Sequence, residues 1–443
     1  MGGRRRRARP PEGEFDAVID SVGHDGRGVA RVDGKATFIH GALPGEQVKF
    51  RYLQRRRNHD EGQVVSVISA SPDRVEPRCA HYGVCGGCSL QHLDSAAQVS
   101  AKQGVLLDNF RQIGRVAPDS ILPPLVNDEP WGYRRKARLG VKNVTRKEKV
   151  LVGFRERGSS YVADLARCEV LHPRVGTLLP ALSALIESLS INNRVPQIEM
   201  AMDDDRCVLI LRLLEPLSGE DEQALNRFQQ TNDVVFYLQP GGPDSVVPLS
   251  AEVDLRYALP DYDVTLSFLP GDFTQVNTEI NRKMVARALD LLDPQPDDQV
   301  LDLFCGIGNF TLPIARSANA VVGVEGDAGL VERARANAER NGLHNATFYT
   351  ADLYGELQAE PWMKQRFNKV LLDPPRSGAL QVLPYLSVMG VQRIVYVSCY
   401  PGTLARDAGE LVGKYGYRLV SAGVMDMFPH TAHVESIALF EKG

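Results

Sequence analysis

The fold is decided by the stretch Leu301-Asp302-Leu303-Phe304-Cys305-Gly306-Ile307-Gly308-Asn309-Phe310. Its first half is an apolar run typical of a buried strand, and its second half places two glycines just before a helical pattern. Glycines in a turn between a strand and a helix let a ligand approach the backbone closely. The stretch therefore predicts a ligand-binding crevice at this turn.

Regular alternation of strands and helices surrounds this stretch and continues to the C-terminus. This pattern is typical of a doubly wound, mainly parallel sheet that binds ligands at the C-terminal ends of its strands. We therefore predict a multidomain α/β protein whose C-terminal domain, residues 266–443, is Rossmann-like. We expect strands at 299–304, 320–325, 346–350, 369–373, 393–398, 418–424 and 434–440, and helices at 309–317, 327–341 and 402–415.

Carboxylates end the next two strands of this predicted sheet. Glu325 can accept hydrogen bonds from ribose hydroxyls, and Asp352 can hold an adenine amino group. Thr311 stands where a dinucleotide motif has its third glycine, and there is no phosphate-binding Walker lysine. S-adenosylmethionine has no phosphate, so a short glycine turn suffices for it. We predict this cofactor, with helix caps as the alternative role of Glu325 and Asp352.

Two further strand ends carry reactive groups, in Asp373-Pro374-Pro375-Arg376 and Ser398-Cys399-Tyr400-Pro401. A thiolate that adds to C6 of a uracil makes C5 electron-rich enough to accept a methyl group from a sulfonium. A base must then remove the C5 proton so that the thiolate can leave. We predict Cys399 as the nucleophile and Glu435, which opens the last strand, as the base. For Cys399 taken alone, a buried core thiol is the alternative.

Three cysteines lie within ten residues: Cys79, Cys85 and Cys88. Cys168 is the next cysteine along the chain, and four thiolates suit either zinc or an iron–sulfur cluster. The spacing does not choose between these two metals. Seven unevenly placed cysteines argue against a disulfide scaffold and for a reducing compartment.

The N-terminal part has short strands separated by glycine turns. Residues 12–70 are expected to form a small OB-like β-barrel, a common nucleic-acid binder, after a disordered basic tail at 1–11. Residues 71–265 are expected to form a central α+β domain, whose helix at 95–113 packs on the C-terminal domain. A second helix is expected at 176–190. The strands that we expect in these two parts lie at 15–19, 28–32, 36–39, 47–52, 62–68, 136–141, 150–154 and 207–213.

Positive charge is concentrated in two places, although the formal net charge is -4. Residues 1–60 hold 13 Lys or Arg against 8 Asp or Glu, and residues 131–160 hold 10 against 2. Two basic clusters on an otherwise acidic chain favour a polyanion partner over the alternative of solvated loops.

No apolar run is long enough to span a membrane, and no secretory signal is present. We therefore expect a cytoplasmic monomer without a membrane partner, and treat a mitochondrial transit peptide as the weaker alternative.

The motifs taken together resemble the RNA uracil-C5 methyltransferase family over about the last 170 residues. They are Phe273-Thr274-Gln275-Val276-Asn277, the glycine turn, Asp373-Pro374-Pro375-Arg376, Ser398-Cys399, Phe428-Pro429-His430-Thr431 and His433-Val434-Glu435. The resemblance implies that Cys399 is the nucleophile and Glu435 the base. It implies contacts to the cofactor or the reacting site by Gln275, Phe304, Asn309, Glu325, Asp352 and Asp373. Tyr400 replaces the asparagine that the family often has there, which leaves open what this side chain does.

The cysteine arrangement is similar to the [4Fe–4S] site of the family's bacterial 23S rRNA branch. That branch begins with a TRAM domain, an OB-like barrel, which matches residues 12–70. The resemblance then extends over nearly the whole chain. It implies methylation of C5 of a specific uracil in a looped or single-stranded region of 23S ribosomal RNA, and cluster ligation by Cys79, Cys85, Cys88 and Cys168.

Four other functions stay open at this point. One is a uracil-C5 methyltransferase of transfer RNA, and another is a catalytically inactive iron–sulfur protein that binds RNA. A cytosine-C5 methyltransferase would be favoured by a Pro-Cys nucleophile in the fourth-strand motif, where this chain has Asp-Pro-Pro-Arg. An N-methyltransferase would need neither Cys399 nor Glu435.

Overall fold

The computed structural model describes residues 10–443, so all but the last two residues of the predicted basic tail lie outside the described part. The chain divides by contacts into two compact units. One comprises Met1–Val105, Glu156–Ser159 and Phe428–His433, and the other comprises Leu106–Arg155, Ser160–Met427 and Val434–Gly443. The three-domain division near residues 70 and 265 stays a proposal. Within the described residues, no helix has both the length and the apolar character needed to cross a membrane.

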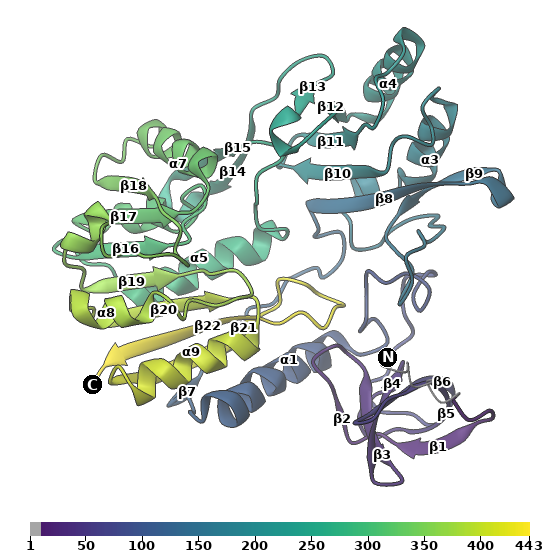
Figure 1. The fold of residues 1–443 in the computed structure, drawn as a ribbon, viewed down its shortest axis with the longest axis horizontal. Helices are drawn as coiled ribbons and strands as arrows, with labels where there is room; N and C mark the ends of the chain where they lie inside the picture. Colours follow the sequence, from purple (N-terminus) through teal and green to yellow (C-terminus); the bar gives the residue numbers. More distant parts are fainter. Residues whose placement is uncertain (1–9) are drawn as a thin grey trace, which may run out of the picture. The chain divides into compact units, whose positions relative to one another are not determined.

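The first unit contains a six-stranded sheet in the order β1-β5-β6-β4-β3-β2 (Figure 1). Its neighbouring strands pair antiparallel except β4 and β6, which pair in parallel. The five predicted strands are all present, and the short β2 is an addition. The bounds are β1 (Phe15–Val18), β2 (Ser21–Val22), β3 (Gly28–Val32), β4 (Lys35–His40), β5 (Gln47–Arg55) and β6 (Asp60–Ser69).

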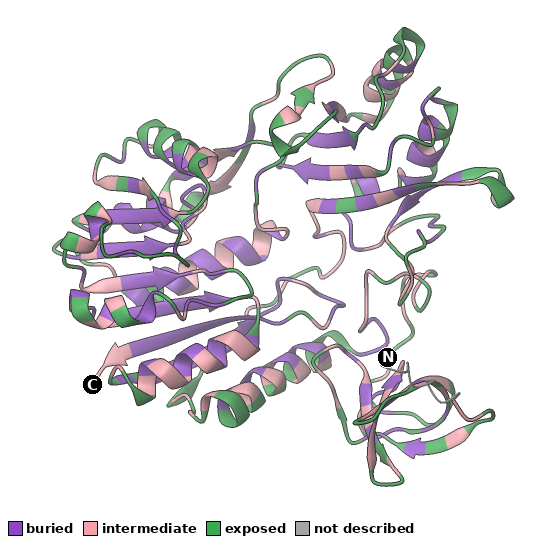
Figure 2. Cartoon of the chain, viewed as in Figure 1, coloured by how far each residue is buried: buried purple, intermediate pink, exposed green. Residues whose placement is uncertain are grey.

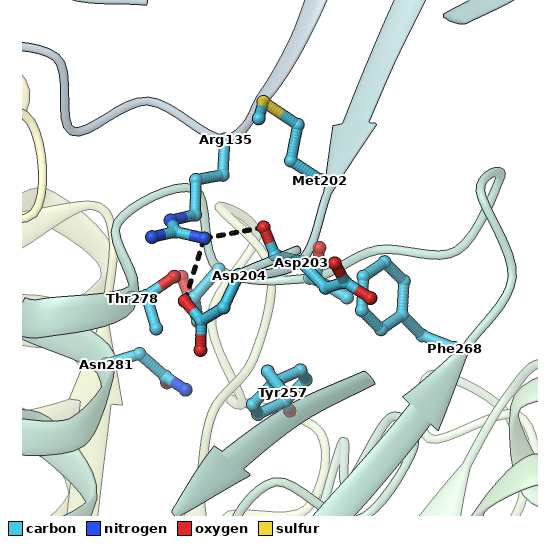
Figure 3. Close-up of a pocket in the computed structure, with 10 residues that line it drawn as sticks. Arg135, Met202, Asp203, Asp204, Tyr257, Phe268, Thr278 and Asn281 are labelled. Carbon is cyan, nitrogen blue, oxygen red and sulfur yellow. Dashed lines mark hydrogen bonds and ion pairs between the residues drawn. The ribbon is translucent and has the colours of Figure 1, made fainter. Parts of the chain in front are cut away.

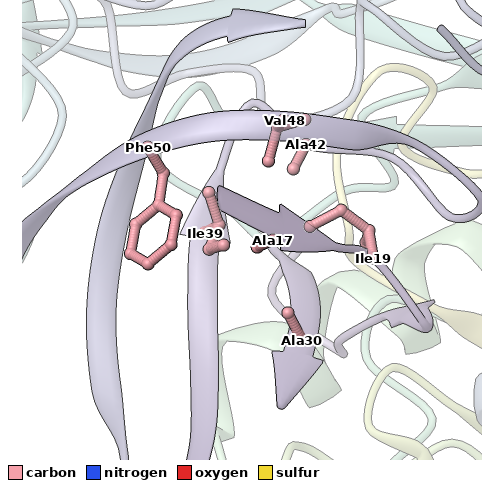
Figure 4. Close-up of a cluster of buried hydrophobic side chains, with 7 residues drawn as sticks. All are labelled: Ala17, Ile19, Ala30, Ile39, Ala42, Val48 and Phe50. Carbon is pink, nitrogen blue, oxygen red and sulfur yellow. The ribbon is translucent and has the colours of Figure 1, made fainter. Parts of the chain in front are cut away.

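Alternate residues of these strands form the core of this sheet (Figure 4). Burial alternates along β5, as a strand with one solvated face requires. Phe50 is the largest side chain of the cluster, and a Cβ on Gly62 would lie 2.6 Å from its ring. Gly62 therefore has to lack a side chain for the strands to close over Phe50. The cluster comprises Ala17, Ile19, Ala30, Ile39, Ala42, Val48 and Phe50.

The predicted helix at 95–113 is present as α1 (Ser95–Asn109), which continues into a π-helical turn, η1 (Phe110–Gly114). The end of this turn contacts α9 (Pro401–Gly413) of the second unit, to which residues from Leu106 onward belong. A Cβ on Gly114 would lie 2.4 Å from the carbonyl oxygen of Ala405. A Cβ on Gly409 would lie 2.8 Å from the carbonyl oxygen of Gly114, so this close approach depends on both glycines.

A second six-stranded sheet, in the order β13-β12-β11-β10-β8-β9, occupies the central part of the chain. The predicted strands and the predicted helix near 176–190 are present. The helix α4 was not predicted, although Ser218 and Asp221 form a capping box that marks its start. The bounds are β8 (Lys136–Val144), β9 (Lys149–Gly153), α2 (Pro173–Gly176), α3 (Leu179–Ser188), β10 (Gln197–Met202), β11 (Cys207–Arg212), α4 (Gly219–Asn232), β12 (Val235–Gln239) and β13 (Val247–Pro248).

The C-terminal sheet has eight strands in the order β18-β17-β16-β19-β20-β22-β21-β7. The five strands from β18 to β20 are parallel, and β22 runs antiparallel between β20 and β21. The chain moves outward from β16 to β18 and returns to β19 on the other side of β16. This reversal is the place where doubly wound sheets bind ligands, and the predicted fold class of this part is confirmed.

Buried residues are concentrated in the strands of this sheet, as expected for strands covered on both faces (Figure 2). The bounds of its strands are β7 (Ser120–Ile121), β16 (Gln299–Leu303), β17 (Ala320–Glu325), β18 (Ala346–Thr350), β19 (Lys369–Leu372), β20 (Arg393–Ser398), β21 (Tyr417–Met425) and β22 (Glu435–Lys442). The other elements of this part are the hairpin β14 (Leu255–Leu259) and β15 (Val264–Phe268), and the helices α5 (Thr278–Leu292), α6 (Thr311–Ala315), α7 (Ala328–Arg340) and α8 (Leu383–Met389).

Candidate active site

The glycine turn after β16 has the backbone geometry that its sequence predicts. Gly306 and Gly308 have φ angles of +54° and +95°, which L side chains rarely adopt. Phe304 also has a positive φ of +66°, which is uncommon for a residue with a side chain and typical of functional turns. A Cβ on Gly306 would meet no described protein atom within 4 Å, so the backbone there borders open space. A ligand can therefore lie against this turn.

Glu325, at the end of β17, faces the glycine turn. Its carboxylate accepts hydrogen bonds from the backbone N–H of Gly306 at 3.2 Å, of Gly326 at 2.7 Å and of Asp327 at 3.2 Å. These bonds fix the carboxylate between two strand ends, where the sequence placed a ribose contact. The ends of β16 and β17 thus lie next to each other at the glycine turn.

Phe304 and Asp352 also lie close to each other at these strand ends. The Phe304 ring has its centroid 5.8 Å from that of Tyr354, whose backbone N–H donates to the carboxylate of the exposed Asp352 at 3.0 Å. An exposed carboxylate and an aromatic face suit the edge and the plane of a purine. The structure therefore brings Phe304, Glu325 and Asp352 together, as predicted.

Asn309 and Gln275 are connected through Asn281 and Tyr257. The Asn309 side chain is hydrogen-bonded to Asn281 on α5 and to Tyr257 on β14. Gln275 lines a small cavity of about 20 Å³ together with Asn281 and Tyr257 (Figure 3). Sequence reasoning missed both partners of Asn309. Asn281 was detectable in principle, because it lies one helical turn after Asn277, the residue that caps α5.

Cys399 and Glu435 are brought together by the register of two strands. Ser398 of β20 pairs with Ser436 of β22, so Cys399 and Glu435 are the next residues at the same sheet end. Burial, followed by the negative charges of Glu435 and Asp373, raises the pKa of Cys399 to about 11. Burial, and then Asp373, raises the pKa of Glu435 well above its usual value. In the site without ligands, the Cys399 thiol therefore holds its proton at neutral pH.

A third buried acid lies beneath the crevice. Asp302 of β16 is fully buried, and one of its oxygens accepts a hydrogen bond from the Thr311 hydroxyl at 2.5 Å, while Oδ1 has no hydrogen-bond partner among the described residues. Burial raises the pKa of Asp302 to about 8, and burial together with the charge of Glu325 raises that of Asp373 to about 7. The carboxyl groups of Asp302, Glu325 and Asp373 lie at the ends of three neighbouring strands, and together they favour a cationic ligand. Asp302 was quoted in the sequence motif but was not predicted as a site residue.

The cysteine loop of the first unit holds Cys79, Cys85 and Cys88, none of which forms a disulfide. The sulfur of Cys85 accepts a hydrogen bond from the Gly87 N–H at 3.4 Å, and burial followed by Cys79 raises the pKa of Cys85. Among the described residues, no three His, Cys, Asp or Glu side chains are placed so that they would hold a metal ion. Cys168 belongs to the second unit. The four-thiol metal site therefore stays a prediction.

Two family models match the chain. Residues 247–443 match the model described as tRNA (Uracil-5-)-methyltransferase, and residues 14–65 match the TRAM domain. The second match confirms the predicted N-terminal domain type.

Curated relatives match over almost the full length. A protein of Xanthomonas campestris pv. campestris, named 23S rRNA (uracil(1939)-C(5))-methyltransferase RlmD, is 57% identical over 442 residues, which is 99% of each chain. A protein of the same name from Alkalilimnicola ehrlichii is 56% identical over 440 residues, again 99% of each chain.

A solved structure shares the fold at lower identity. The Pyrococcus abyssi tRNA (uracil-54, C5)-methyltransferase, in complex with S-adenosyl-L-homocysteine, superposes with a TM-score of 0.73 and is 23% identical. The match covers 96% of this chain and 99% of that one. It confirms the arrangement of strands and helices around the glycine turn.

Proposed function

Because the chain belongs to the RlmD family of uracil-C5 methyltransferases, we propose that it methylates C5 of one uracil in 23S ribosomal RNA with S-adenosylmethionine as the methyl donor. The relatives' names point to the uracil equivalent to position 1939. The observation that carries the chemistry is the pairing of Ser398 with Ser436, which sets Cys399 beside Glu435 at the end of the sheet that holds the glycine turn.

Cys399 and Glu435 divide the reaction between them. Cys399 first loses its thiol proton to solvent; the thiolate then bonds to C6 of the uracil, and the electron pair of the C5–C6 double bond moves into an enolate. C5 then bonds to the methyl carbon while the bond from that carbon to the donor's sulfur breaks. Glu435 takes the proton from C5, the C5–C6 double bond reforms, and the Cys399 sulfur leaves as a thiolate.

Ligand binding has to change the protonation of both groups. A thiol with a pKa of about 11 is almost wholly protonated at neutral pH, and the raised pKa of Glu435 favours its protonated form, which accepts no proton. Arg376 lowers the pKa of both groups, and the positive charge of a bound sulfonium acts in the same direction. The nucleophile and the base thus become active once cofactor and RNA are in place.

The affinity for S-adenosylmethionine is expected to rise with pH. Asp373 and Asp302, with pKa values of about 7 and 8, are neutral below those values, and a sulfonium cation favours their charged forms. Binding the cation therefore releases protons, and the dissociation constant falls up to about tenfold per pH unit for each proton released, before levelling off above pH 8 or so.

Calorimetry at pH 6, 7 and 8, in buffers of different ionisation enthalpy, measures both the affinity and the number of protons released. S-adenosylhomocysteine has no sulfonium charge and is the matched control, for which a weaker dependence is expected. Asp302→Asn removes one of the two groups and is expected to flatten the profile. If the affinities for the two ligands changed equally steeply with pH, Asp302 and Asp373 would not be responding to the sulfonium charge, and this prediction would be wrong.

RNA recognition is proposed for the N-terminal barrel, because TRAM domains share the OB-like architecture that often binds nucleic acids. The target uracil is expected in a loop or single strand, because flipping it out of the stack there costs less free energy than flipping it out of a duplex. We place the enzyme in the cytoplasm as a monomer.

The substrate assignment is tested with RNA from cells that lack the protein. Labelled methyl groups should enter 23S ribosomal RNA at one uracil and leave transfer RNA unlabelled. If the label were found in transfer RNA instead, the chain would be a transfer RNA methyltransferase and the proposed substrate would be wrong.

A [4Fe–4S] cluster on Cys79, Cys85, Cys88 and Cys168 remains a proposal that rests on the spacing of these cysteines, none of which forms a disulfide. No step of the reaction depends on this cluster. Iron and sulfide analysis of anaerobically purified protein, together with its visible absorption, decides the matter. About four iron atoms per chain are expected, whereas zinc or a metal-free protein would refute the cluster.

A further inference from the structure

The side chain of Asn309 is held by two residues that the proposed reaction does not use. Asn309 and Asn281 form a reciprocal amide pair, in which each Nδ2 donates to the other's Oδ1 at 3.0 Å. The Tyr257 hydroxyl donates to the same Asn309 Oδ1 at 2.9 Å. The three residues come from the glycine turn, from α5 and from β14, so each is held by a separate element.

Counting hydrogen bonds shows what Asn309 has left to offer. Its oxygen has two acceptor sites, and both are occupied by Tyr257 and Asn281. Its NH₂ group has two hydrogens, of which one is donated to Asn281. Only one N–H of this amide is unused by the two partners, so Asn309 can offer a ligand a donor but no acceptor.

Tyr257 decides which way round the amide pair lies. An amide pair can turn over as a unit, because exchanging oxygen and nitrogen on both side chains preserves its two hydrogen bonds. In the turned-over arrangement the Tyr257 hydroxyl would face an NH₂ group, and its hydrogen would lose its acceptor. Burial raises the pKa of Tyr257, so the hydroxyl keeps that hydrogen over the working pH range.

We propose that Tyr257 and Asn281 are positioning residues that fix the Asn309 amide with its N–H toward the methyl donor, where it binds an oxygen acceptor of that ligand. This inference rests on the proposed function, in which Asn309 contacts the cofactor. Tyr257 and Asn281 also line the cavity that contains Gln275, a second predicted cofactor contact (Figure 3). Tyr257 and Asn281 therefore connect Asn309 with the cavity that Gln275 lines.

Tyr257→Phe tests the proposal, because it removes the hydroxyl and keeps the ring. Binding of S-adenosylmethionine and of S-adenosylhomocysteine is measured by calorimetry without RNA. We expect both dissociation constants to rise about tenfold, which is the loss of roughly one oriented hydrogen bond. The KM for S-adenosylmethionine should rise by a similar factor, while kcat at saturation changes by less than about twofold.

A double-mutant cycle separates positioning from a general structural effect. In an Asn309→Ala background, Tyr257→Phe should have no further effect on affinity, because its action passes through the missing amide. Asn281→Ala is a second single variant and should weaken binding in the same way. The matched control is Tyr237→Phe on β12, whose hydroxyl accepts a hydrogen bond from the Val253 N–H at 2.9 Å. This control should leave the affinity unchanged.

Two results would overturn the proposal. Unchanged affinity in both Tyr257→Phe and Asn281→Ala would show that the amide needs no positioning. A tenfold loss that persists in the Asn309→Ala background would show that Tyr257 acts by another route. Normal binding of S-adenosylmethionine by Asn309→Ala would show in addition that Asn309 does not contact the cofactor, which is part of the proposed function. The roles of Cys399 and Glu435 are unaffected by any of these results, since binding is measured without RNA.

Discussion

Cys399→Ala is expected to abolish methyl transfer while leaving RNA binding intact. The alanine has no atom that can bond to C6, and without that bond C5 of uracil is too electron-poor to attack a sulfonium. Removing a catalytic nucleophile lowers kcat by about 10⁴-fold or more in other enzymes, and a loss of at least this size is expected here. The measurement is incorporation of labelled methyl groups into 23S ribosomal RNA, together with filter binding of the same RNA.

Cys207→Ala is the matched control for this variant. Cys207 is a buried thiol of β11, in the central sheet, and it belongs to no proposed site. Its loss leaves a small cavity that costs stability but changes no group near the crevice. Normal methyl transfer is expected from Cys207→Ala. Substantial activity in Cys399→Ala would show that the thiol is a packing residue, which is the alternative that the isolated cysteine left open.

The C-terminal sheet could be predicted closely because its strands are apolar, short and regularly separated by helices. That pattern predicts the doubly wound, mainly parallel sheet, and the glycine turn predicts the end of the strands at which ligands bind, whereas the order of the strands comes from the structure. The position of β22 between β20 and β21 could not be read from the chain, because antiparallel insertion of a last strand leaves no local mark. The pairing of Ser398 with Ser436, on which the reaction depends, is therefore known from the structure alone.

The residues that sequence reasoning missed share one property: their role depends on partners far away in the chain. Tyr257 lies 52 residues before Asn309. Neither the residues around Tyr257 nor their distance along the chain from the glycine turn indicates that the two are in contact. Asp302 was read as part of an apolar strand, and its unusual pKa arises from burial beside Glu325 and Asp373. The cysteine spacing predicts a metal site, and this site stays a prediction because no three metal-ligating side chains are grouped among the described residues.

Glu435→Gln is expected to trap the enzyme on its RNA. Glutamine has nearly the same size and can hold the same position at the start of β22, but its amide accepts no proton at neutral pH. Addition of Cys399 and methyl transfer should still take place, because neither needs the base. The C5 proton then stays in place, the C6–S bond does not break, and a covalent protein–RNA adduct accumulates. Turnover is expected to fall by about 10³-fold.

The charge change strengthens this expectation. The carboxyl group of Glu435 is one of the groups that raise the pKa of Cys399, and a neutral amide removes that contribution. The thiol should therefore deprotonate more easily in Glu435→Gln, so the addition step is not slowed. An adduct that forms as fast as in the natural enzyme, and then persists, distinguishes loss of the base from damage to the nucleophile.

A denaturing gel of enzyme mixed with S-adenosylmethionine and labelled RNA measures the adduct. The double variant Cys399→Ala with Glu435→Gln should show none, because the bond is to Cys399. Glu441→Gln, on the same strand and paired with Arg393, removes a carboxylate away from the crevice and should turn over normally. Lost turnover without an adduct would mean that Glu435 acts before the carbon–sulfur bond forms. The base would then have to be sought among the other carboxyl groups at this sheet end, of which Asp373 raises the pKa of both reacting groups through its charge.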